Sequence, residues 1–399
     1  ARAAQLQPVL ERFSSWLDRY GETSWDHQSY YAGAWGRFAK GLYYKNKVLG
    51  MAAVSPMVFS EAFFPAARRL FHQRMRLPIA DAHYAMGFAY LYEGTGEAKY
   101  LARAAHFAEV LQGSRSPGYP NACWGDPFNW VTRNGMLKEH TPFITTTPYV
   151  YEAFAQLQKL QPHPAWQAIM ESAVRYAAED IKDQPYAGGG RTCSYMPEGE
   201  FKVVNASAYR AGMLALAAKQ FGRDEWLQTA LANVDFVIAA QNPDGSWPYA
   251  KDGVRDFVDH FHTCFVMKGI AKVYLATGNA RIRNALAKGL DYYQQNLFDA
   301  TGMPRPFSVA PRLTVYRNEL YDCAESINLC LLLRAEFPQL NDTLNRVVDG
   351  ILANWVKPDG SFRSRRLKFG WDNVPMHRWA QSQMFRALAF YLREINTKR

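Results

Sequence analysis

The sequence predicts an all-α fold in which about six helical hairpins close into a ring. One plan recurs along nearly the whole chain: an apolar helical run, a short turn, a second helical run, and a loop rich in aromatic and charged residues. Successive copies begin 54 to 65 residues apart (the differences between the starting positions given below), a regularity typical of repeat architectures. A helical hairpin cannot bury its apolar stripe alone, so the units are expected to stack on one another. The copies begin near Asp81, Thr146, Asn205, Asp259 and Asp322, and a shorter one begins at Met376.

The fourth unit shows why each element is expected to be helical. Between residues 260 and 276 the apolar side chains recur at three- and four-residue steps, which is the period of a helix. The Thr-Gly-Asn sequence at 277–279 then ends the run, because Gly and Asn tolerate the positive φ of a helix end. A return helix is expected over 281–298. The other predicted pairs of helices are 81–92 with 98–111, 206–221 with 224–240, and 324–337 with 342–356.

Length and composition predict one domain that covers residues 1–399. The hairpin plan runs almost from end to end, without a Ser/Gly linker or a low-complexity tract. No apolar run approaches the roughly 20 residues that cross a bilayer, and the longest candidate, 48–64, is interrupted by polar residues and Pro56. We therefore expect no transmembrane segment.

The five cysteines are odd in number, widely spread, and form no CxxC pair, so neither a zinc knuckle nor a disulfide framework is expected. This favours a reducing compartment and thus the cytoplasm. A periplasmic or secreted location is the alternative if a leader has been removed.

The charge balance favours an anionic partner. The formal net charge is +10 and the isoelectric point is about 9.2. An anionic glycan, an acidic membrane surface and nucleic acid all fit this charge. Four basic residues, Arg363, Arg365, Arg366 and Lys368, cluster in one loop, but no nucleic-acid motif accompanies them, which argues against nucleic acid. The oligomeric state stays open.

The loops between hairpins are longer than the turns within them and carry the unusual chemistry. They are predicted at 122–130, 242–259, 302–321 and 358–376. In a ring of hairpins all of these loops fall on the same face, so their Trp, Tyr, Arg, Asp and His side chains converge on one mouth. We expect the functional site there.

Two short motifs resemble the repeat of a known superfamily. Residues 241–247 form the pattern QxxDGSW, and residues 357–362, with the sequence KPDGSF, are a weaker echo of it. This resembles the repeat of the α-toroid superfamily, which includes terpene cyclases, protein prenyltransferase subunits and many carbohydrate-processing enzymes. The chain as a whole is similar to toroid proteins of bacterial exopolysaccharide biosynthesis clusters. The resemblance implies an (α/α)6 toroid.

Two branches of that superfamily do not fit the sequence. Triterpene cyclases protonate their substrate through a DxDD motif, which is missing here. Residues 260–264 are similar to the histidine segment of the prenyltransferase zinc site, but the Asp-x-Cys pair that precedes it in that family is missing. Zinc needs at least three protein ligands, so no metal is expected. No glycine-rich nucleotide loop is present, and no cofactor is expected.

The resemblance therefore implies a polysaccharide or oligosaccharide substrate, and the composition agrees. Aromatic residues make up 15% of the chain, and flat rings suit the apolar faces of sugars, while Arg and Asn suit hydroxyls and carboxylates. The candidate substrate-binding residues are Trp124, Asn129, Trp130, Arg133, Asn205, Tyr209, Trp247, Arg255, Trp371, His377 and Arg378.

Glycoside hydrolysis is the first expectation for the reaction. It needs one protonated and one ionised carboxyl group, and we expect Asp126 and Asp372 to form this pair. Asp259 and Glu325 are further catalytic candidates. Each has a structural alternative: an Asx-turn for Asp126, the N-cap of a helix for Asp259, and a capping box with Asp322 for Glu325.

A uronate lyase or C5-epimerase is the alternative. Such enzymes remove the C5 proton of a uronic acid with a base and neutralise the adjacent carboxylate. The candidates for these roles are His262, Tyr209, Asn205, His140 and His377, and Arg133, Arg255 or Arg378 could hold the carboxylate. His260 and His262 are two positions apart, so they point to different sides of a helix and cannot both face the mouth.

Two further points stay open at the level of sequence. Trp25, Asp26 and His27 either add a wall to the mouth or cap an aromatic helix. The third functional alternative is a non-catalytic, glycan-binding subunit of a polysaccharide biosynthesis system.

Overall fold

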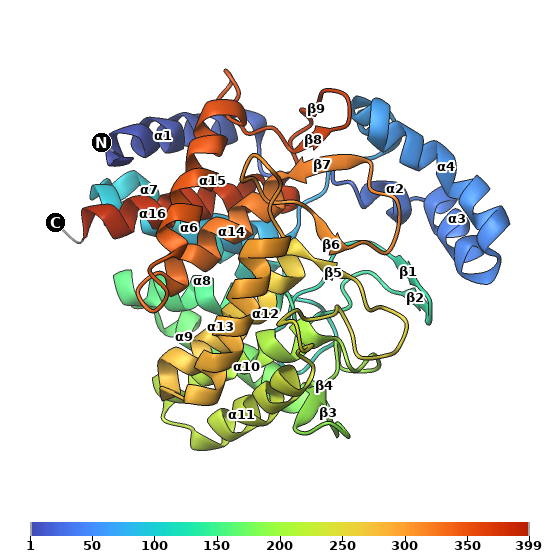
Figure 1. Cartoon of the computed structure of the whole chain (residues 1–399). Helices are drawn as coiled ribbons and strands as arrows, with labels where there is room; N and C mark the ends of the chain where they lie inside the picture. The colour runs from blue at the N-terminus through green and yellow to red at the C-terminus, as the bar shows by residue number, and fades with distance from the viewer. Residues whose placement is uncertain (1, 398–399) are drawn as a thin grey trace.

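Two concentric layers of helices form the body of the protein (Figure 1). The computed structural model describes residues 2–397. The helices of the inner layer are α6 (Pro78–Thr95), α8 (Thr147–Leu160), α10 (Val204–Phe221), α12 (His260–Thr277), α14 (Leu320–Leu333) and α16 (Ser382–Asn396). The helices of the outer layer are α1 (Arg2–Tyr20), α7 (Ala98–Gly113), α9 (Pro164–Arg175), α11 (Asp224–Ala239), α13 (Ala280–Asn296) and α15 (Leu340–Asn354). The inner helices are buried on nearly all sides, as expected for helices without a polar face, and the main core lies between the two layers.

The predicted hairpins are confirmed, with inner helices that begin within a few residues of the expected starts. The turns have the predicted chemistry: Gly96, Gly222 and Gly278 end α6, α10 and α12 with φ values of 75°, 65° and 67°. The two largest differences have local causes. Helix α6 begins three residues early because Pro78 occupies its first turn, where proline is favoured. Helix α14 begins at Leu320 rather than Ala324, since Leu320 and Cys323 are fully buried in the core.

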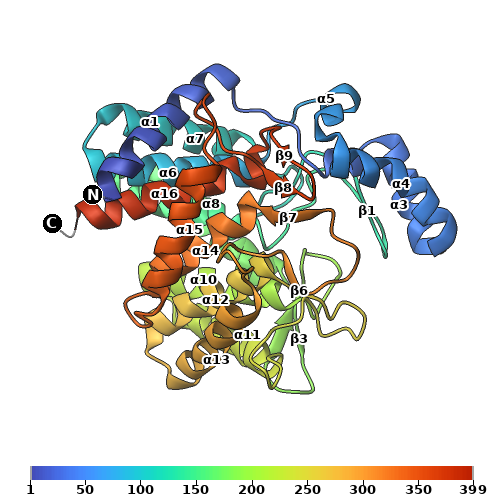
Figure 2. The ribbon, with the colours of Figure 1, turned by 45° about the horizontal axis from the view of Figure 1, so that its top comes forward.

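The ring is closed by two ends of the chain. The sequence predicts a shorter sixth unit at Met376, but its outer helix is α1, from the N-terminus, which packs against α16. The Phe13 ring of α1 stacks on Phe385 of α16 at 5.0 Å and on Phe362 at 5.3 Å between ring centroids. Figure 2 shows both termini on the same side of the molecule.

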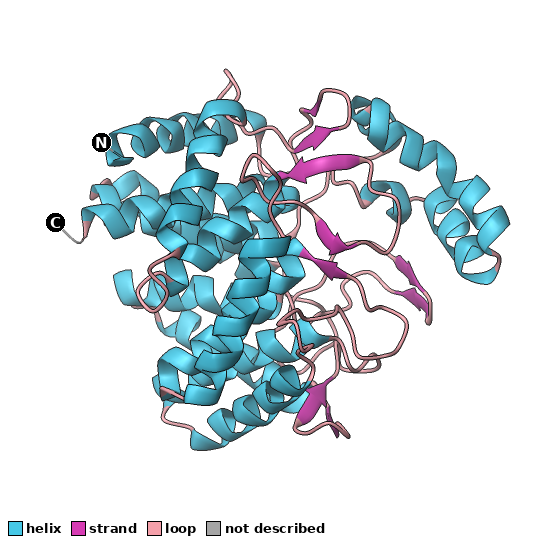
Figure 3. Cartoon of the chain, in the orientation of Figure 1, coloured by secondary structure: helices cyan, strands magenta, loops and turns pink. Residues whose placement is uncertain are grey.

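The connections between hairpins all lie at one rim, as predicted. They contain the short antiparallel strands β1 (Trp130–Thr132), β2 (Gly135–Leu137), β3 (Asp183–Pro185), β4 (Arg191–Cys193), β5 (Val258–Asp259), β6 (Phe307–Val309), β7 (Tyr316–Glu319), β8 (Arg365–Leu367) and β9 (Trp371–Asp372). The strand orders are β1-β2, β3-β4, β5-β6 and β7-β8-β9. Figure 3 shows every strand on the same side of the helical body. We call this rim the mouth.

An insertion between α1 and α6 projects from the mouth side (Figure 2). It consists of α2 (Ser29–Ala32), α3 (Ala34–Lys45), α4 (Lys47–Phe63), a 3-10 turn (Pro65–Ala67) and α5 (Arg68–Phe71). The apolar run at 48–64, whose polar interruptions argue against a membrane span, lies in α4 and its C-cap residue Phe64, with Pro56 inside the helix. Among the described residues, no helix is both long and apolar enough to cross a membrane.

Candidate active site

Each inner helix contributes one polar side chain to the axis of the ring. We call this group the axial cluster. Its members are His83 of α6, Tyr149 of α8, Tyr209 of α10, Lys268 of α12, Glu325 of α14 and Arg386 of α16. All six side chains are at most 9% exposed. The ring fold therefore assembles a polar centre from segments that are hundreds of residues apart.

A chain of hydrogen bonds links four members of the axial cluster. The hydroxyl groups of Tyr149 and Tyr209 lie 2.8 Å apart, and Lys268 Nζ donates to the Tyr149 hydroxyl at 3.2 Å. Lys268 also forms an ion pair with Glu325. Burial lowers the pKa of Lys268, and Glu325 opposes this shift; burial raises the pKa values of Tyr149 and Tyr209 well above their usual range. Both tyrosines therefore keep their protons at neutral pH.

The other side of the cluster presents free hydrogen-bonding capacity. Arg386 donates to His83 Nδ1 at 3.1 Å, and because arginine only donates, the His83 proton lies on Nε2. Burial lowers the pKa of His83 well below its usual value, so this ring is neutral. The His83 Nε2, Arg386 Nε, Gln383 Nε2 and Asn205 Oδ1 atoms have no hydrogen-bond partner among the residues that the structure describes. Buried polar groups are normally bonded, so these atoms keep unused hydrogen-bonding capacity.

An aromatic floor lies above the axial cluster, toward the mouth. Trp379 stacks on Tyr321 with 4.1 Å between centroids and 17° between planes, and Phe261 meets both rings edge-on. The Trp379 indole N–H donates to Glu319 Oε2 at 2.7 Å, which fixes the orientation of the ring. Trp379 and Phe261 keep partial contact with solvent. Oriented rings of this kind can pack on the apolar face of a sugar.

His262 and Asp259 form a hydrogen-bonded pair beside this floor. Asp259 caps α12 by accepting from the His262 backbone N–H at 3.2 Å, which confirms the predicted N-cap. Its other oxygen lies 2.6 Å from His262 Nδ1. An ionised carboxylate only accepts, so we assign the imidazole proton to Nδ1 and the lone pair to Nε2. His262 is 20% exposed, whereas His260 is buried against Tyr293, so the predicted divergence of the two histidines is confirmed.

Asp126 lies beside Arg378 at the mouth and keeps partial contact with solvent. Its side chain is 16% exposed, and burial raises its pKa; Arg378 opposes this shift and Asp26 adds to it. Arg378 NH1 approaches Asp126 Oδ2 at 3.3 Å and holds Asp26 at 2.8 and 3.1 Å. The His27 ring lies 4.6 Å from that of Trp379, so His27 lies beside the aromatic floor. Trp25 instead donates its indole N–H to the backbone oxygen of His72 at 2.7 Å.

The expected pairing of Asp126 with Asp372 is not observed, because the two aspartates bind different arginines. Asp372 is 1% exposed and accepts from Arg68 at 3.0 Å and from the Val374 backbone N–H at 3.0 Å. It belongs to a buried network in which Arg68 also binds Glu61, at 2.7 Å. Its oxygens are engaged in holding the insertion to the ring, because Glu61 is on α4 and Arg68 is on α5.

Asp322 is a buried acid for which only a capping role was predicted. Neither of its oxygens has a hydrogen-bond partner among the described residues. Its pKa is raised well above the usual value, first by burial and then by the negative charges of Glu319, Asp259 and Glu325. The expected capping box with Glu325 is wrong, because Glu319 occupies the N-cap position of α14 and both acids lie inside the helix. The signal that could have revealed Asp322 is the recurrence of acids at 319, 322 and 325 on one helical face.

Four predicted substrate-binding residues have structural roles instead. Trp124 and Trp247 are core residues whose indole N–H groups donate to the backbone oxygens of Leu111 and Val237. His377 is buried and bonded to the Tyr84 hydroxyl at 2.6 Å. Asn129 accepts from the backbone of Glu139 and thereby shapes its own loop.

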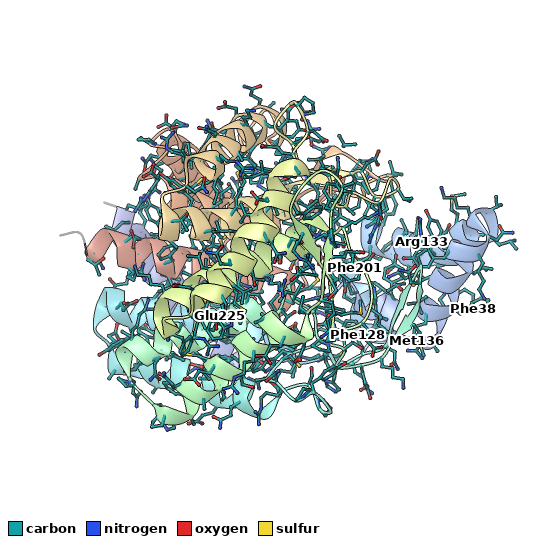
Figure 4. All side chains as sticks on the ribbon, turned by 90° about the horizontal axis from the view of Figure 1, so that it is seen from below. Phe38, Phe128, Arg133, Met136, Phe201 and Glu225 are labelled. Atoms are coloured by element: carbon teal, nitrogen blue, oxygen red, sulfur yellow. The ribbon has the colours of Figure 1, made fainter. Side chains whose placement is uncertain are left out.

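The remaining predicted residues line the outer parts of the mouth or the axis. Trp371 packs edge-on against Trp355, and Trp130 lies under the Lys40 ammonium at 3.3 Å. Arg255 is 27% exposed and paired with Glu200 and Asp252. Figure 4 shows Arg133 beside the helices of the insertion, away from the axis. Of the predicted set, Asn205, Tyr209 and Arg378 lie with the axial cluster or the aromatic floor.

Two hollows of about 400 Å³ each lie outside the mouth. One is on the outer face of α7, and the other is in the loop at 112–122. None of the candidate catalytic residues lines either hollow. They provide no alternative centre, because neither brings together a set of paired or buried titratable groups.

Comparisons with known proteins identify the architecture. Neither a protein-family model nor a curated protein matches the sequence. Among solved structures, a cellobiose 2-epimerase from Bacillus thermoamylovorans B4167 has a TM-score of 0.61 at 8% identity, over 79% of this chain and 88% of that one. An unsaturated glucuronyl hydrolase specific for heparin has a TM-score of 0.60 at 12% identity, over 82% and 89%. A polysaccharide lyase has a TM-score of 0.60 at 10% identity, over 99% and 98%. The chain thus has the (α/α)6 toroid fold that these solved structures share.

Proposed function

We propose that this protein is an enzyme that removes a proton from a uronate unit of a polysaccharide or oligosaccharide, as a lyase or a C5-epimerase. The observation that carries the proposal is the Asp259–His262 pair beside the aromatic floor. Its accessible base is an imidazole held by a carboxylate, whereas the expected carboxylate partner of Asp126 is buried in an ion network. That arrangement suits C–H proton abstraction better than a two-carboxylate hydrolysis.

The chemistry follows from the positions of the charges. His262 Nε2 takes the C5 proton, and the C–H electron pair is delocalised into the adjacent carboxylate, which a guanidinium group stabilises. Arg378 and Arg255 are the mouth arginines for that role. In elimination, the electron pair from the C5–H bond forms the C4=C5 double bond, the C4–O4 bond breaks, and the departing oxygen takes a proton. Asp126, whose pKa is raised, is the donor. In epimerisation, C5 is reprotonated from the opposite face instead.

The comparisons support this class of substrate without deciding the reaction. The polysaccharide lyase matches the chain over nearly its entire length, and the unsaturated glucuronyl hydrolase is specific for heparin, as its name states. The net charge of +10 agrees with an anionic glycan.

Assays of the unmodified chain and of a His262 variant on acidic and neutral glycans test the proposal. Lyase action produces ultraviolet absorbance from unsaturated uronate, and epimerase action produces deuterium at C5 in heavy water without chain cleavage. His262→Gln should lower kcat by about 10²- to 10⁴-fold, the usual range for a general base. The control is His163→Asn, in the α8–α9 turn at the opposite rim, where Asn can still cap α9. Unchanged kcat in His262→Gln would refute the proposed role of the base.

Hydrolysis is the second candidate, and the raised pKa of Asp126 favours it. New reducing ends without unsaturated product or deuterium incorporation would identify a hydrolase. Asp126→Asn should then abolish cleavage, since an amide cannot protonate the leaving oxygen. Tight glycan binding without any turnover across the panel would instead identify a binding subunit.

A further inference from the structure

The insertion carries most of the exposed apolar surface of the molecule. Eleven of the 18 large apolar side chains that are exposed in the described part of the chain lie between residues 34 and 70. On α4 and just after it, Val48 is 71% exposed, Phe59 57% and Phe64 62%. Soluble monomers rarely expose a contiguous apolar patch of this kind unless something covers it.

The insertion does not bury this surface within itself. Only Gly50 and Met57 of α4 are buried, and the local core consists of Tyr30, Ala39 and Met57. Helices α3 and α4 pack on each other and stand out from the ring, so the patch is convex (Figures 1 and 2). In Figure 4, Phe38 lies at the outer edge of the insertion. A convex apolar ridge fits a deformable surface better than a flat protein face.

Basic residues border the patch, and acidic residues do not. Residues 29–71 contain six basic residues and one acidic residue, a net charge of +5. Three basic residues are exposed: Lys45 at the end of α3, Lys47 at the start of α4, and Arg69 in α5. The one acid, Glu61, points inward and pairs with Arg68 and Arg365.

The basic loop at 363–368, which the proposed reaction does not use, extends the same surface. Arg365 turns inward to Glu61, whereas Arg366 and Lys368 are exposed. The next residue, Phe369, is 77% exposed and stacks on Phe63 of α4 at 6.5 Å. The β8–β9 turn and the insertion thus form one apolar surface with a basic border.

We propose that this surface, which we call the docking ridge (α3, α4, α5 and the turn at 368–370), binds an anionic phospholipid membrane. Exposed Trp, Tyr and Phe side chains next to Lys and Arg are typical of helices that lie in the membrane interface. Helix α4 does not meet the length and apolarity of a membrane span, so it lies in the plane of the interface. A second copy of the chain is the poorer occupant, because it would bring two segments of charge +5 together.

The ridge is joined to the mouth by the buried ion network. Glu61 of α4 binds Arg365 at 2.9 Å, Arg365 binds Glu319 at 3.2 Å, and Glu319 holds the Trp379 indole. Membrane binding through the ridge would therefore place the mouth next to the bilayer. This inference does not depend on the proposed reaction, since it involves neither His262 nor Asp126.

Sedimentation of the full chain with lipid vesicles tests the proposal. One set of vesicles contains only phosphatidylcholine, and the other also contains phosphatidylglycerol. We expect binding to the anionic vesicles that weakens with salt. Lys45→Gln with Lys47→Gln should weaken it on the order of thirtyfold, at about 1 kcal/mol for each basic residue near the surface. Val48→Ser with Phe59→Ser should weaken it at least tenfold, by removing apolar insertion.

Matched controls lie on the opposite rim. Leu275, at the end of α12, is 54% exposed, and Lys219, at the end of α10, is exposed. Leu275→Ser and Lys219→Gln should leave vesicle binding within twofold of the unmodified chain, and thermal unfolding should show that all variants fold. No binding to anionic vesicles, or equal loss in ridge and control variants, would overturn the proposal. So would a dimer that forms without lipid and dissociates in Val48→Ser with Phe59→Ser, since the ridge would then bind a second copy.

Discussion

At the scale of single residues, four aspartates with the same chemistry have four different environments. Asp259 accepts two hydrogen bonds from His262, and Asp372 is bound by Arg68. Asp126 touches solvent beside Arg378, and Asp322 is fully buried without a hydrogen-bond partner among the described residues. Desolvation and neighbouring charge, rather than residue type, decide which of them can carry a proton at neutral pH.

The raised pKa of Asp322 gives a prediction about stability. The folded state holds this proton to higher pH than the unfolded state, which releases it near pH 3.9. Stability falls with rising pH wherever the folded state binds more protons, so the wild-type chain should lose stability relative to Asp322→Asn from about pH 4 upward. The slope of the difference in unfolding free energy should approach about 1.4 kcal/mol per pH unit.

Urea unfolding at a series of pH values measures this difference. The control is Asp291→Asn, on the exposed face of α13, for which the difference should stay nearly flat. A difference for Asp322→Asn that is independent of pH between 4 and 7 would show that Asp322 is ionised in the folded protein.

At the scale of secondary-structure elements, one hairpin shows how the same type of helix start serves two purposes. Asp259 caps α12 at the mouth, and Asn279 caps α13 at the opposite rim by accepting from the Arg281 backbone N–H. Both side chains satisfy a backbone donor at a helix end. Only Asp259 also orients an imidazole.

Substitution of the two caps separates stability from activity. Asp259→Ala and Asn279→Ala should each lower the unfolding free energy by about 1 kcal/mol, the usual value of an N-cap. Asp259→Asn should retain the cap but lose the charge that stabilises a protonated His262, so it should lower kcat without a comparable loss of stability. The measurements are denaturant unfolding and turnover of the glycan on which the unmodified chain is active in the assay described above. Equal turnover in Asp259→Asn and the unmodified chain would contradict the role of the pair.

At the scale of the whole molecule, the ring depends on a contact between the two ends of the chain. Helix α1 packs on α16, and Phe13 stacks on Phe385 across a separation of more than 370 residues. Phe13 is fully buried. A toroid opened at this joint would expose the core faces of α16 and α6, which lie next to each other.

Removal of the Phe13 side chain from this joint should therefore weaken the entire ring. Phe13→Ala should lower the unfolding free energy by about 3–5 kcal/mol, the usual cost of removing a buried phenylalanine. The control Phe38→Ala, at a 58% exposed position of α3, should change it by no more than about 0.5 kcal/mol. Far-ultraviolet circular dichroism and tryptophan fluorescence should report the same shift. A loss in Phe13→Ala as small as that in the control would show that α1 does not hold the ring together.

The hairpins and the common rim were predictable because they depend on local periodicity. The apolar spacing of α12, the Gly278 turn and the Asp259 cap are all encoded within a few residues of one another. The insertion was not predicted, because α4 lies outside the recurring hairpin plan and its apolar residues are exposed rather than packed in the core. The prediction that Trp124 and Trp247 bind substrate was wrong for a related reason. Both residues lie in mouth loops, but their side chains turn back into the core.

The helical hairpins, their order and the rim at which their connections meet can all be predicted from the chain, because each follows from short-range pattern and turn chemistry. The folded structure was needed to show that α1 completes the last hairpin and that His83, Glu325 and Arg386 meet on one axis. It also shows that Asp372 is buried while His262 faces solvent. Burial and charge pairing depend on neighbours that are hundreds of residues away, and no local pattern in the chain records them.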